Sequence, residues 1–283
     1  IGTTSIETFN GLGGTDTVDY SASDIAVNID LDRNEISGGF AEGDTLISIE
    51  NVIGSDDASQ RDYLYGDDGV NELYGMAGRD ILEGGAGADI IDGGSDKDYA
   101  RYMRSDAAVS INLETNVNTG GHAEGDLLYS IEYVTGSQYG DNITGDGNNN
   151  SLFGEQGNDI LNGGGGNDRI RGREGDDTLT GGSGADDFIF ETEGLTSVDT
   201  ITDFNSVEGD TIEISDLLDN YDETTDAITD FVWMVDEGAN TALYVDTDGQ
   251  GTAETWTRIA TLNGVNGLTD EEALETNATL ITA

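Results

Sequence analysis

Apolar residues recur along much of this chain with a period of nine. From Gly66 to Arg101 and from Gly136 to Ile189, successive nine-residue frames carry Gly at position 1, usually Gly at position 4, Asp or Asn at position 6 and an apolar residue at position 8. One apolar residue in nine cannot form the stripe of an amphipathic helix, which needs about three or four in every seven. A short strand with one inward side chain, followed by a glycine-rich turn, fits this spacing and predicts a coiled β-solenoid.

A longer repeat appears when the chain is compared with itself at an offset of 82 residues. Ala41-Glu42-Gly43-Asp44 then falls on Ala123-Glu124-Gly125-Asp126. The segments between the nonapeptide arrays alternate apolar and polar residues, as in AVNIDL and AVSINL, so we expect strands that continue the solenoid with wider coils. After Gly54 the offset falls to 79, which predicts a loop around residues 55–61.

The nonapeptides stop after Ile189, and the composition of the remaining residues becomes ordinary. Segments such as DTITDF, DTIEI and FVWMV predict strands, and Trp233 and Trp256 are expected in a core. Two helix starts are indicated, with Ser215 as an N-cap and a capping box at residues 269–272.

The predicted fold is therefore all-β: a parallel β-roll of nonapeptide repeats with wider strand inserts, followed by a small β-rich module with one or two short helices. We expect the roll over residues 1–189, in two long repeats at about 11–92 and 93–189, and the module over residues 190–283. The longest apolar runs hold only a few residues, far fewer than the ~20 of a membrane-spanning helix, so we expect no membrane insertion.

The charge balance changes the picture, because 10 Lys and Arg face 59 Asp and Glu and leave a net charge of −49. Such repulsion makes nucleic acids and anionic membrane surfaces poor partners. With 35% hydrophobic residues the chain lies near the disordered side of the balance between charge and hydrophobicity, so a cation must neutralise it before it folds. Cysteine is absent, which excludes disulfides, thiolate metal sites and a thiol nucleophile.

Stacked rungs would place the position-6 carboxylates ~4.8 Å apart, where like charges repel. Calcium fits such turns, because it takes about six to eight carboxylate and carbonyl oxygens in flexible geometry, whereas magnesium demands a tighter octahedron. Zinc would need the absent cysteines or more than the single His122, which we expect at the surface. The alternating Arg169, Arg171 and Arg173 are interpreted as a solvated strand face that softens local acidity.

The frames resemble the GGxGxDxUx nonapeptide of the RTX, or repeats-in-toxin, calcium-binding β-roll. In that family two nonapeptides form one coil, and the position-6 residue shares an ion with the matching turn eighteen residues on. In the first array the resemblance implies one edge with Asp62, Asp80 and Asp98 and another with Asn71 and Asp89. In the second array it implies one edge with Asp141, Asp159 and Asp177 and another with Asn150, Asp168 and Asp186. The glycines that it implies beside the ions are Gly66, Gly75, Gly78, Gly84, Gly87, Gly154, Gly157, Gly163, Gly166, Gly172, Gly175, Gly181 and Gly184.

Together the arrays imply about seven to ten calcium ions. Asn71 and Asn150 carry no charge, so the ions beside them are expected to bind more weakly. Asp96 replaces the position-4 glycine of its frame, which puts the Asp98 site in doubt. Whether the isolated frame with Asp16 forms a site is left open. The same holds for the turn with Asp246 and Asp248.

The tail resembles the carboxy-terminal target domain of type I secreted RTX proteins, especially large adhesins, in GADDFIF, GDTIEISDLL and IATLNGVNGLTD. That resemblance implies export of the unfolded chain by an ABC transporter, a periplasmic adaptor and an outer-membrane channel, and a secreted or cell-surface location. Because the chain begins at Ile1 without an amino-terminal signal, we expect it to be a fragment of a longer protein. We expect a monomer.

The sequence therefore favours a non-enzymatic module that folds outside the cell on binding calcium and serves type I secretion of a bacterial RTX protein, an adhesin above all. One histidine and no cysteine leave no Ser-His or metal-histidine constellation. The alternative is a polysaccharide-binding accessory module of an RTX enzyme such as an alginate epimerase or lipase, because those enzymes also carry RTX rolls.

Overall fold

A computed structural model of the chain describes residues 2–192, 195–218, 228–246, 256–265 and 280–281. These residues form short strands and a few 3-10 turns, with no α-helix among them, which confirms the all-β prediction. Their contacts divide the chain into two compact units, unit 1 at Ile1–Gln138 and unit 2 at Tyr139–Ala283. In the described part of the chain, no helix is long and apolar enough to cross a membrane.

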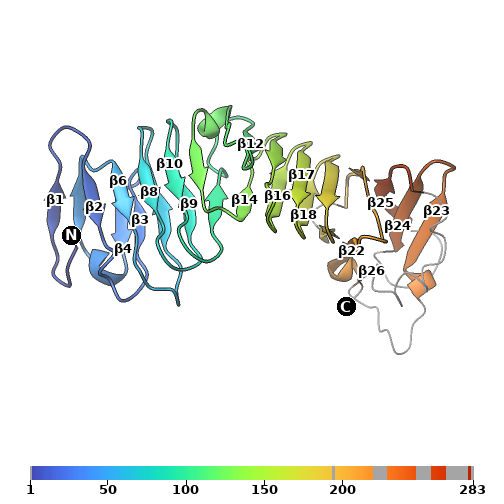
Figure 1. The fold of residues 1–283 in the computed structure, drawn as a ribbon, viewed down its shortest axis with the longest axis horizontal. Helices are drawn as coiled ribbons and strands as arrows, with labels where there is room; N and C mark the ends of the chain where they lie inside the picture. The colour runs from blue at the N-terminus through green and yellow to red at the C-terminus, as the bar shows by residue number, and fades with distance from the viewer. Residues whose placement is uncertain (1, 193–194, 219–227, 247–255, 266–279, 282–283) are drawn as a thin grey trace. The chain divides into compact units, whose positions relative to one another are not determined.

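Unit 1 is a parallel β-roll whose consecutive strands alternate between two sheets. The first sheet runs in the order β13 (Leu127–Tyr129), β10 (Ile90–Asp92), β8 (Glu72–Tyr74), β6 (Asn51–Ile53) and β2 (Thr17–Asp19). The second runs in the order β14 (Tyr133–Thr135), β11 (Tyr99–Arg101), β9 (Ile81–Glu83), β7 (Tyr63–Tyr65), β3 (Asn28–Asp30) and β4 (Glu35–Ser37). Only the β3–β4 pair of these sheets is antiparallel. Figure 1 shows β6, β8 and β10 side by side.

Five further elements belong to the described part of unit 1. They are β1 (Thr8–Asn10), which pairs with β5 (Thr45–Ile47), the strand β12 (Ser110–Asn112), and the 3-10 helices η1 (Gly39–Ala41) and η2 (Gly121–Ala123). The two helices are 82 residues apart, so the long repeat seen in the sequence is also a repeat of structure.

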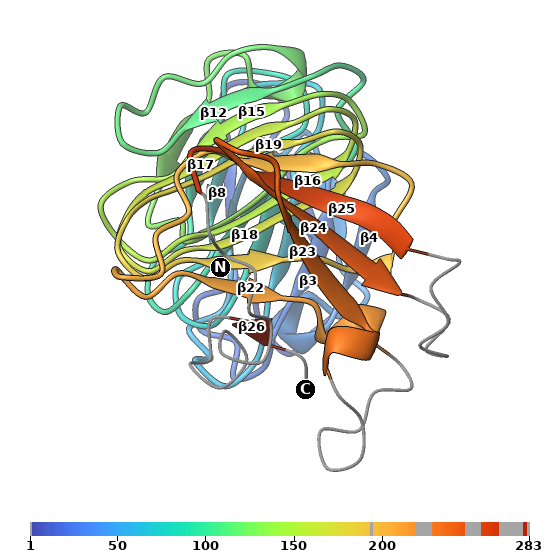
Figure 2. The ribbon, with the colours of Figure 1, turned by 90° about the vertical axis from the view of Figure 1, so that its right-hand side faces the viewer.

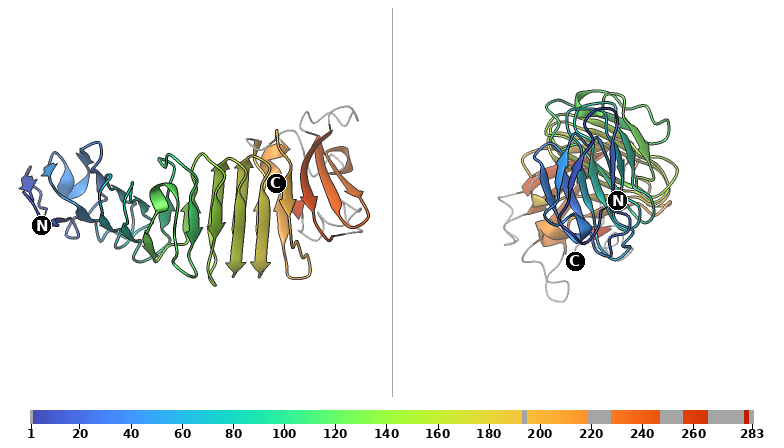
Figure 3. Two further views of the ribbon diagram at one scale, coloured as in Figure 1. Left: turned by 90° about the horizontal axis from the view of Figure 1, so that it is seen from above. Right: turned by 90° about the vertical axis from the view of Figure 1, so that its left-hand side faces the viewer.

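Unit 2 continues the same alternation of strands. One sheet runs in the order β15 (Asn142–Thr144), β17 (Ile160–Gly165), β19 (Thr178–Ser183), β21 (Asp199–Ile201), β25 (Trp256–Leu262), β24 (Thr241–Asp246) and β23 (Val232–Asp236). The other runs in the order β16 (Ser151–Gln156), β18 (Arg169–Glu174), β20 (Asp187–Ile189), β22 (Thr211–Glu213) and β26 (Leu280–Ile281). The yellow-green strands of Figure 3 show this parallel stacking, and Figure 2 shows the antiparallel β23, β24 and β25 side by side.

The core consists of one inward residue per nonapeptide strand, as the period of nine predicts. Leu161 pairs with Leu179, and Leu152 pairs with Ile170, each eighteen residues on. Burying one such side chain stabilises the fold by about 1.5–3 kcal/mol. The position-8 residues of both arrays are all fully buried: Leu73, Leu82, Ile91, Ala100, Ile143, Leu152, Leu161, Ile170, Leu179 and Phe188.

The wider coils that the long repeat predicts are present in unit 1. Strand β13 pairs with β10 although its Leu128 follows Ile91 by 37 residues. The tyrosine hydroxyl of Tyr102 donates to Asp126 Oδ2 at 2.9 Å, and the equivalent bond from Tyr20 to Asp44 is 3.0 Å long. The expected loop at residues 55–61 is confirmed, because no strand lies between Ile53 and Tyr63.

Two expectations for the tail are wrong. Ser215 is the first residue of the 3-10 helix η4 (Ser215–Leu217) and makes no cap, because the segment after β22 folds into a single tight turn behind Ile214. The second tail helix that the structure shows, η5 (Ile228–Asp230), is also a 3-10 helix. Trp233 is 48% exposed, because the alternation of β23 turns Val232 and Met234 inward and the Trp233 ring outward. The capping box at 269–272 lies outside the described residues.

The division expected at residue 189 differs from the division between the compact units. Strand β21 pairs with β19 and β22 pairs with β20, so strands beyond Ile189 extend the sheets of the roll without a break. The described part of the tail therefore packs as a continuation of unit 2.

Candidate metal centre

The position-6 residues of the frames form hydrogen-bonded ladders along the turns. In each ladder the Oδ1 atom of one carboxylate accepts the backbone N–H of the residue eighteen positions earlier, as Asp80 does from Asp62 at 2.8 Å. The same bond joins Asp98 to Asp80, Asp89 to Asn71, Asp159 to Asp141, Asp177 to Asp159, Asp168 to Asn150 and Asp186 to Asp168, at 2.7–2.9 Å. The structure thus brings together the pairs that the resemblance implies, and their role as ligands stays a prediction.

In seven of these aspartates the second carboxylate oxygen has no hydrogen-bond partner within the described part of the chain. A buried, ionised oxygen without a partner is costly, so its neighbourhood calls for a cation. The residues with such an Oδ2 atom, each at most 2% exposed, are Asp80, Asp89, Asp98, Asp159, Asp168, Asp177 and Asp186.

The position-1 glycines leave space beside these orphaned oxygens. A Cβ atom on Gly163 would collide with Asp168 Oδ2 and lie 2.6 Å from the carbonyl oxygen of Gly181 on the next coil. Each expected position-1 glycine has the position-6 side-chain oxygen of its own frame in the same place. A carboxylate oxygen and a main-chain carbonyl oxygen therefore converge beside Gly75, Gly154 and Gly163, which is the oxygen set that calcium prefers.

The position-4 glycines serve the turn through their backbone conformation. All six expected ones, from Gly78 to Gly184, have positive φ, such as 130° at Gly175. A Cβ there would also strike the preceding coil, since the carbonyl oxygen of Gly157 faces Gly175. Glycine meets both requirements without strain.

The ladders hold carboxyl groups that resist ionisation in the absence of a cation. Burial raises the pKa of Asp80 and Asp159 to about 8. A carboxyl whose pKa is higher in the folded than in the unfolded chain opposes folding at neutral pH, because ionising it costs more in the folded state. Burial has the same effect on five other ladder aspartates, with a pKa of about 7 for Asp89, Asp98 and Asp168 and about 6 for Asp177 and Asp186.

The asparagine at the start of one ladder is satisfied without an ion. Asn71 Nδ2 donates to the carbonyl oxygen of Glu50 at 2.7 Å, and Asn71 Oδ1 accepts from the backbone of Asp67 at 2.9 Å. The amide group of Asn71 thus satisfies its surroundings with a hydrogen bond, whereas an aspartate at this position would need a cation. This supports the expectation that calcium binds more weakly beside Asn71.

The frames of Asp98 and Asp16 turn out to be equivalent. Asp98 keeps its ladder although Asp96 takes the strained φ of 79° at position 4. Asp16, 82 residues before Asp98, also has a buried Oδ2 without a partner within the described residues. A Cβ on Gly11 would meet this oxygen and the carbonyl oxygen of Ser48, just as one on Gly93 would meet those of Asp98 and Ser130.

Four acidic residues outside the nonapeptides extend the ladders, and the sequence analysis missed them. Asp126 accepts from Asp89 N at 2.9 Å, and Asp199 accepts from Asp177 N at 3.1 Å. Glu132 and Asp210 extend the ladders of Asp98 and Asp186 in the same way. They lie 22 to 37 residues from their ladder partners, so the eighteen-residue period of the nonapeptide coils does not identify them. The available signal was an acid two residues before a buried apolar residue, as in Asp199-Thr200-Ile201.

Acidic side chains do not gather into metal-binding clusters in the described part of the chain. Among the described residues, no three His, Cys, Asp or Glu side chains come together as a group that could hold a metal ion. The turn sites therefore rest on one carboxylate combined with main-chain oxygens. Asp246 is buried at the end of β24, and Asp248 lies outside the described residues.

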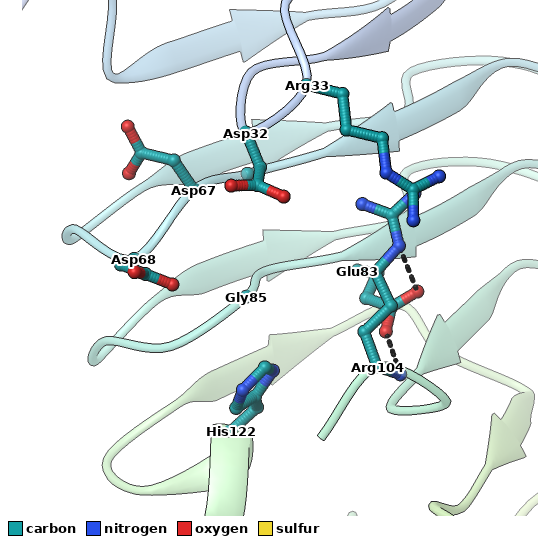
Figure 4. A pocket seen from close by; sticks show the side chains of 9 residues that line it. Asp32, Arg33, Asp67, Asp68, Glu83, Gly85, Arg104 and His122 are labelled. Carbon is teal, nitrogen blue, oxygen red and sulfur yellow. Dashed lines mark hydrogen bonds and ion pairs between the residues drawn. The ribbon is translucent and has the colours of Figure 1, made fainter. Parts of the chain in front are cut away.

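Two interpretations of non-acidic residues are confirmed. Arg171 pairs with Glu191 at 3.3 Å and Arg173 with Glu155 at 2.7 Å, so this strand face softens local acidity. His122 is half-exposed and lines a cavity of about 240 Å³ in unit 1, as expected of a surface residue. Figure 4 shows this cavity, where dashed lines join Arg104 to the buried Glu83.

Comparison with known proteins agrees with the geometry of the turns. Residues 65–100, 135–170 and 162–191 match the family described as the RTX calcium-binding nonapeptide repeat (4 copies). The chain thus carries RTX repeats, and these repeats bind calcium. A similar solved structure is the AlgE6R3 subunit of the Azotobacter vinelandii mannuronan C5-epimerase, with 27% identity and a TM-score of 0.35 over 52% of this chain and 80% of that one. No curated protein matches the chain.

Proposed function

We propose that this chain is the calcium-dependent folding and type I secretion module of a bacterial RTX protein, an adhesin above all, without enzymatic activity of its own. The observation that carries the proposal is the row of buried carboxylate oxygens that have no hydrogen-bond partner among the described residues, each next to a position-1 glycine. Without calcium these groups oppose folding, and with calcium they contribute binding energy to it.

The physical mechanism is a folding switch. In a calcium-poor cell interior the chain with its net charge of −49 stays extended and can be threaded through an export channel. Outside, calcium neutralises the turns, and its binding free energy becomes folding free energy. If the carboxy-terminal end leaves first, folding there hinders the chain from sliding back.

Several features support a secreted location and an export role for the tail. RTX repeats are typical of secreted bacterial proteins. Asp199 and Asp210, which follow the repeats, accept ladder bonds from Asp177 and Asp186. Tail and repeats therefore share the same ladders, which fits a tail that folds together with the roll after export through the ABC transporter, adaptor and outer-membrane channel.

Calcium titration tests the switch. Chelator-treated protein is titrated with calcium while far-ultraviolet circular dichroism is recorded, with magnesium at the same concentrations as the control. We expect a cooperative gain of β-structure with calcium alone. A chain that is equally structured in the chelator would disprove the switch.

A separate experiment tests export. The full chain and a chain ending at residue 189 are produced in bacteria that contain a type I secretion assembly, and the fraction found in the medium is measured. We expect export of the full chain only. Equal export of both forms would refute the secretion role and leave the folding switch intact.

A further inference from the structure

Three of the ten basic residues form a column along one edge of unit 1. Arg61, Arg79 and Lys97 each precede a ladder aspartate, so they occupy the same place on three successive rungs, eighteen residues apart. Nothing in the nonapeptide pattern requires a cation there. The equivalent places on the other edge of unit 1 and in unit 2 hold Val70, Ala88, Gly140, Asn149, Asn158, Asn167, Asp176 and Ala185.

Among the described residues the column has no carboxylate at ion-pairing distance, although Arg61 lies near enough to Asp80 to favour its ionised form and Asp96 lines a cavity with Arg79 and Lys97. In the described part of the chain, none of these three side chains forms an ion pair, although the chain has 59 acids. The three cations stand on rungs ~4.8 Å apart, where they repel one another. Once calcium neutralises the ladder of Asp62, Asp80 and Asp98 beneath them, the column is left to attract an external anion.

Aromatic rings lie directly beside the column. The rings of Tyr99 and Tyr133 stack with centroids 4.5 Å apart, and the Arg79 guanidinium lies 5.2 Å and 4.7 Å from them. Arg79 also donates to the Tyr99 hydroxyl at 2.6 Å. Arg61 lies over Tyr99, and Lys97 lies over Tyr133. These contacts hold the cations in place on a platform that combines apolar ring faces with hydroxyl groups.

The same surface is open to a ligand. A cavity of about 280 Å³ is lined by Ala58, Gly78, Arg79, Asp96, Lys97 and Tyr133. Arg79 and Lys97 are exposed, and Tyr63, in the same row of the sheet as Tyr99, is 36% exposed. Fixed cations, the exposed ring of Tyr63 and a shallow cavity therefore lie together on one edge of unit 1.

We propose that this basic-aromatic surface, formed by Arg61, Arg79, Lys97, Tyr63, Tyr99 and Tyr133, binds an anionic polysaccharide of the polyuronate type. Guanidinium groups bind carboxylates with good geometry, and tyrosine rings accept the apolar faces of sugar rings. The column spans ~10 Å, two rung steps, which suits a chain with well-separated carboxylates. Duplex nucleic acid, with a charge every ~1.7 Å, would meet far stronger repulsion from the net charge of −49.

Binding of an oligogalacturonate of about six residues to the calcium-loaded protein tests this proposal by titration calorimetry. The test variant is Arg61→Gln/Arg79→Gln/Lys97→Gln. The matched control is Arg169→Gln/Arg171→Gln/Arg173→Gln, which removes the same three charges from an ion-paired strand face of unit 2. We expect binding that weakens with salt, a loss of about tenfold or more in the test variant, and a change within about twofold in the control.

Every other outcome overturns the proposal. Equal binding by the test variant would mean that calcium merely bridges the uronate to protein carboxylates. Equal binding of a neutral oligosaccharide would show that the charges of the column play no role. Tighter binding of a single-stranded oligonucleotide would identify a different partner. The absence of any binding would refute the site. Calcium-induced circular dichroism verifies folding of each variant, and the exposed Lys97→Gln alone replaces the triple variant if that one does not fold.

Discussion

Adjacent aspartates in one turn occupy very different environments. Asp177 is 2% exposed, accepts a ladder bond from Asp159 with Oδ1 and has no partner for Oδ2 within the described residues. Asp176, its neighbour, is exposed and accepts the backbone N–H of Val198. The identity of the residue is the same, so its position in the frame decides whether a carboxylate opposes folding or is harmless.

The pair Asp177→Asn and Asp176→Asn tests this difference. Asp177→Asn keeps the Oδ1 acceptor and removes a buried charge, so the calcium-free chain should become easier to fold. With calcium, the loss of a charged ligand should raise the half-saturating concentration by about tenfold, or ~1.4 kcal/mol. Asp176→Asn should change stability by less than about 0.5 kcal/mol. Melting curves with calcium and with chelator measure both, and identical shifts for the two variants would contradict the assignment.

Two glycines of the second array provide a similar comparison. A Cβ on Gly163 would enter the space beside Asp168 Oδ2, whereas one on Gly147 would meet nothing within 4 Å. We expect Gly163→Ala to destabilise the calcium-loaded protein by about 1–3 kcal/mol. Gly147→Ala should be neutral or stabilise it by about 0.4–1 kcal/mol, because it restricts only the unfolded chain. Thermal unfolding in the presence of calcium measures both stabilities. Equal losses of stability in the two variants would show that the space beside Asp168 Oδ2 has no special role.

At the scale of the element, each strand of the roll is too short to be stable alone and depends on its neighbours. A nonapeptide strand buries one residue, such as Leu161 between Ile143 and Leu179, so the stack carries the stability. The strands at the ends of the arrays need not be nonapeptides to join it. Strand β21 adds Asp199 and Ile201 to the rung beyond Asp177 and Leu179 with a connection of 22 residues.

Asp199→Asn tests whether such end strands complete a calcium site. Burial, followed by the charge of Asp177, raises the pKa of Asp199 to about 8, as in the ladder aspartates of the arrays. We expect the variant to bind one calcium ion fewer per chain than the parent, as counted by equilibrium dialysis. Asp216→Asn, an exposed substitution in η4, is the control and should leave the count unchanged. An unchanged count in Asp199→Asn would limit the sites to the nonapeptides.

At the scale of the whole molecule, the excess of acid over base sets the condition for folding. Calcium ions at the turns of the ladders neutralise part of the net charge of −49, because each ion cancels two charges. The remaining acids keep the unfolded chain expanded and soluble. The basic residues are few enough that their placement carries information, as the column of unit 1 and the ion pairs of Arg171 and Arg173 illustrate.

Small-angle scattering tests the behaviour of the whole chain. In chelator we expect an expanded chain with a radius of gyration near the unfolded value of about 60 Å for this length. Calcium should contract it in one transition, and magnesium at the same concentration should not, because it loses its water reluctantly. A compact chain in chelator would show that packing alone folds the roll.

The sequence by itself determined the roll and its core, because the nine-residue register fixes which residue faces inward and which residue lies at the turn, and its resemblance to RTX repeats implied the pairing of acids. Leu161 and Asp159 could be assigned without coordinates for that reason. Tertiary structure decided what depends on distance across uneven connections. It placed Asp126, Glu132, Asp199 and Asp210 in the ladders and turned the ring of Trp233 outward. It also set Arg61, Arg79 and Lys97 over stacked tyrosines, because only the folded coils bring residues from separate frames and a wider insert into contact.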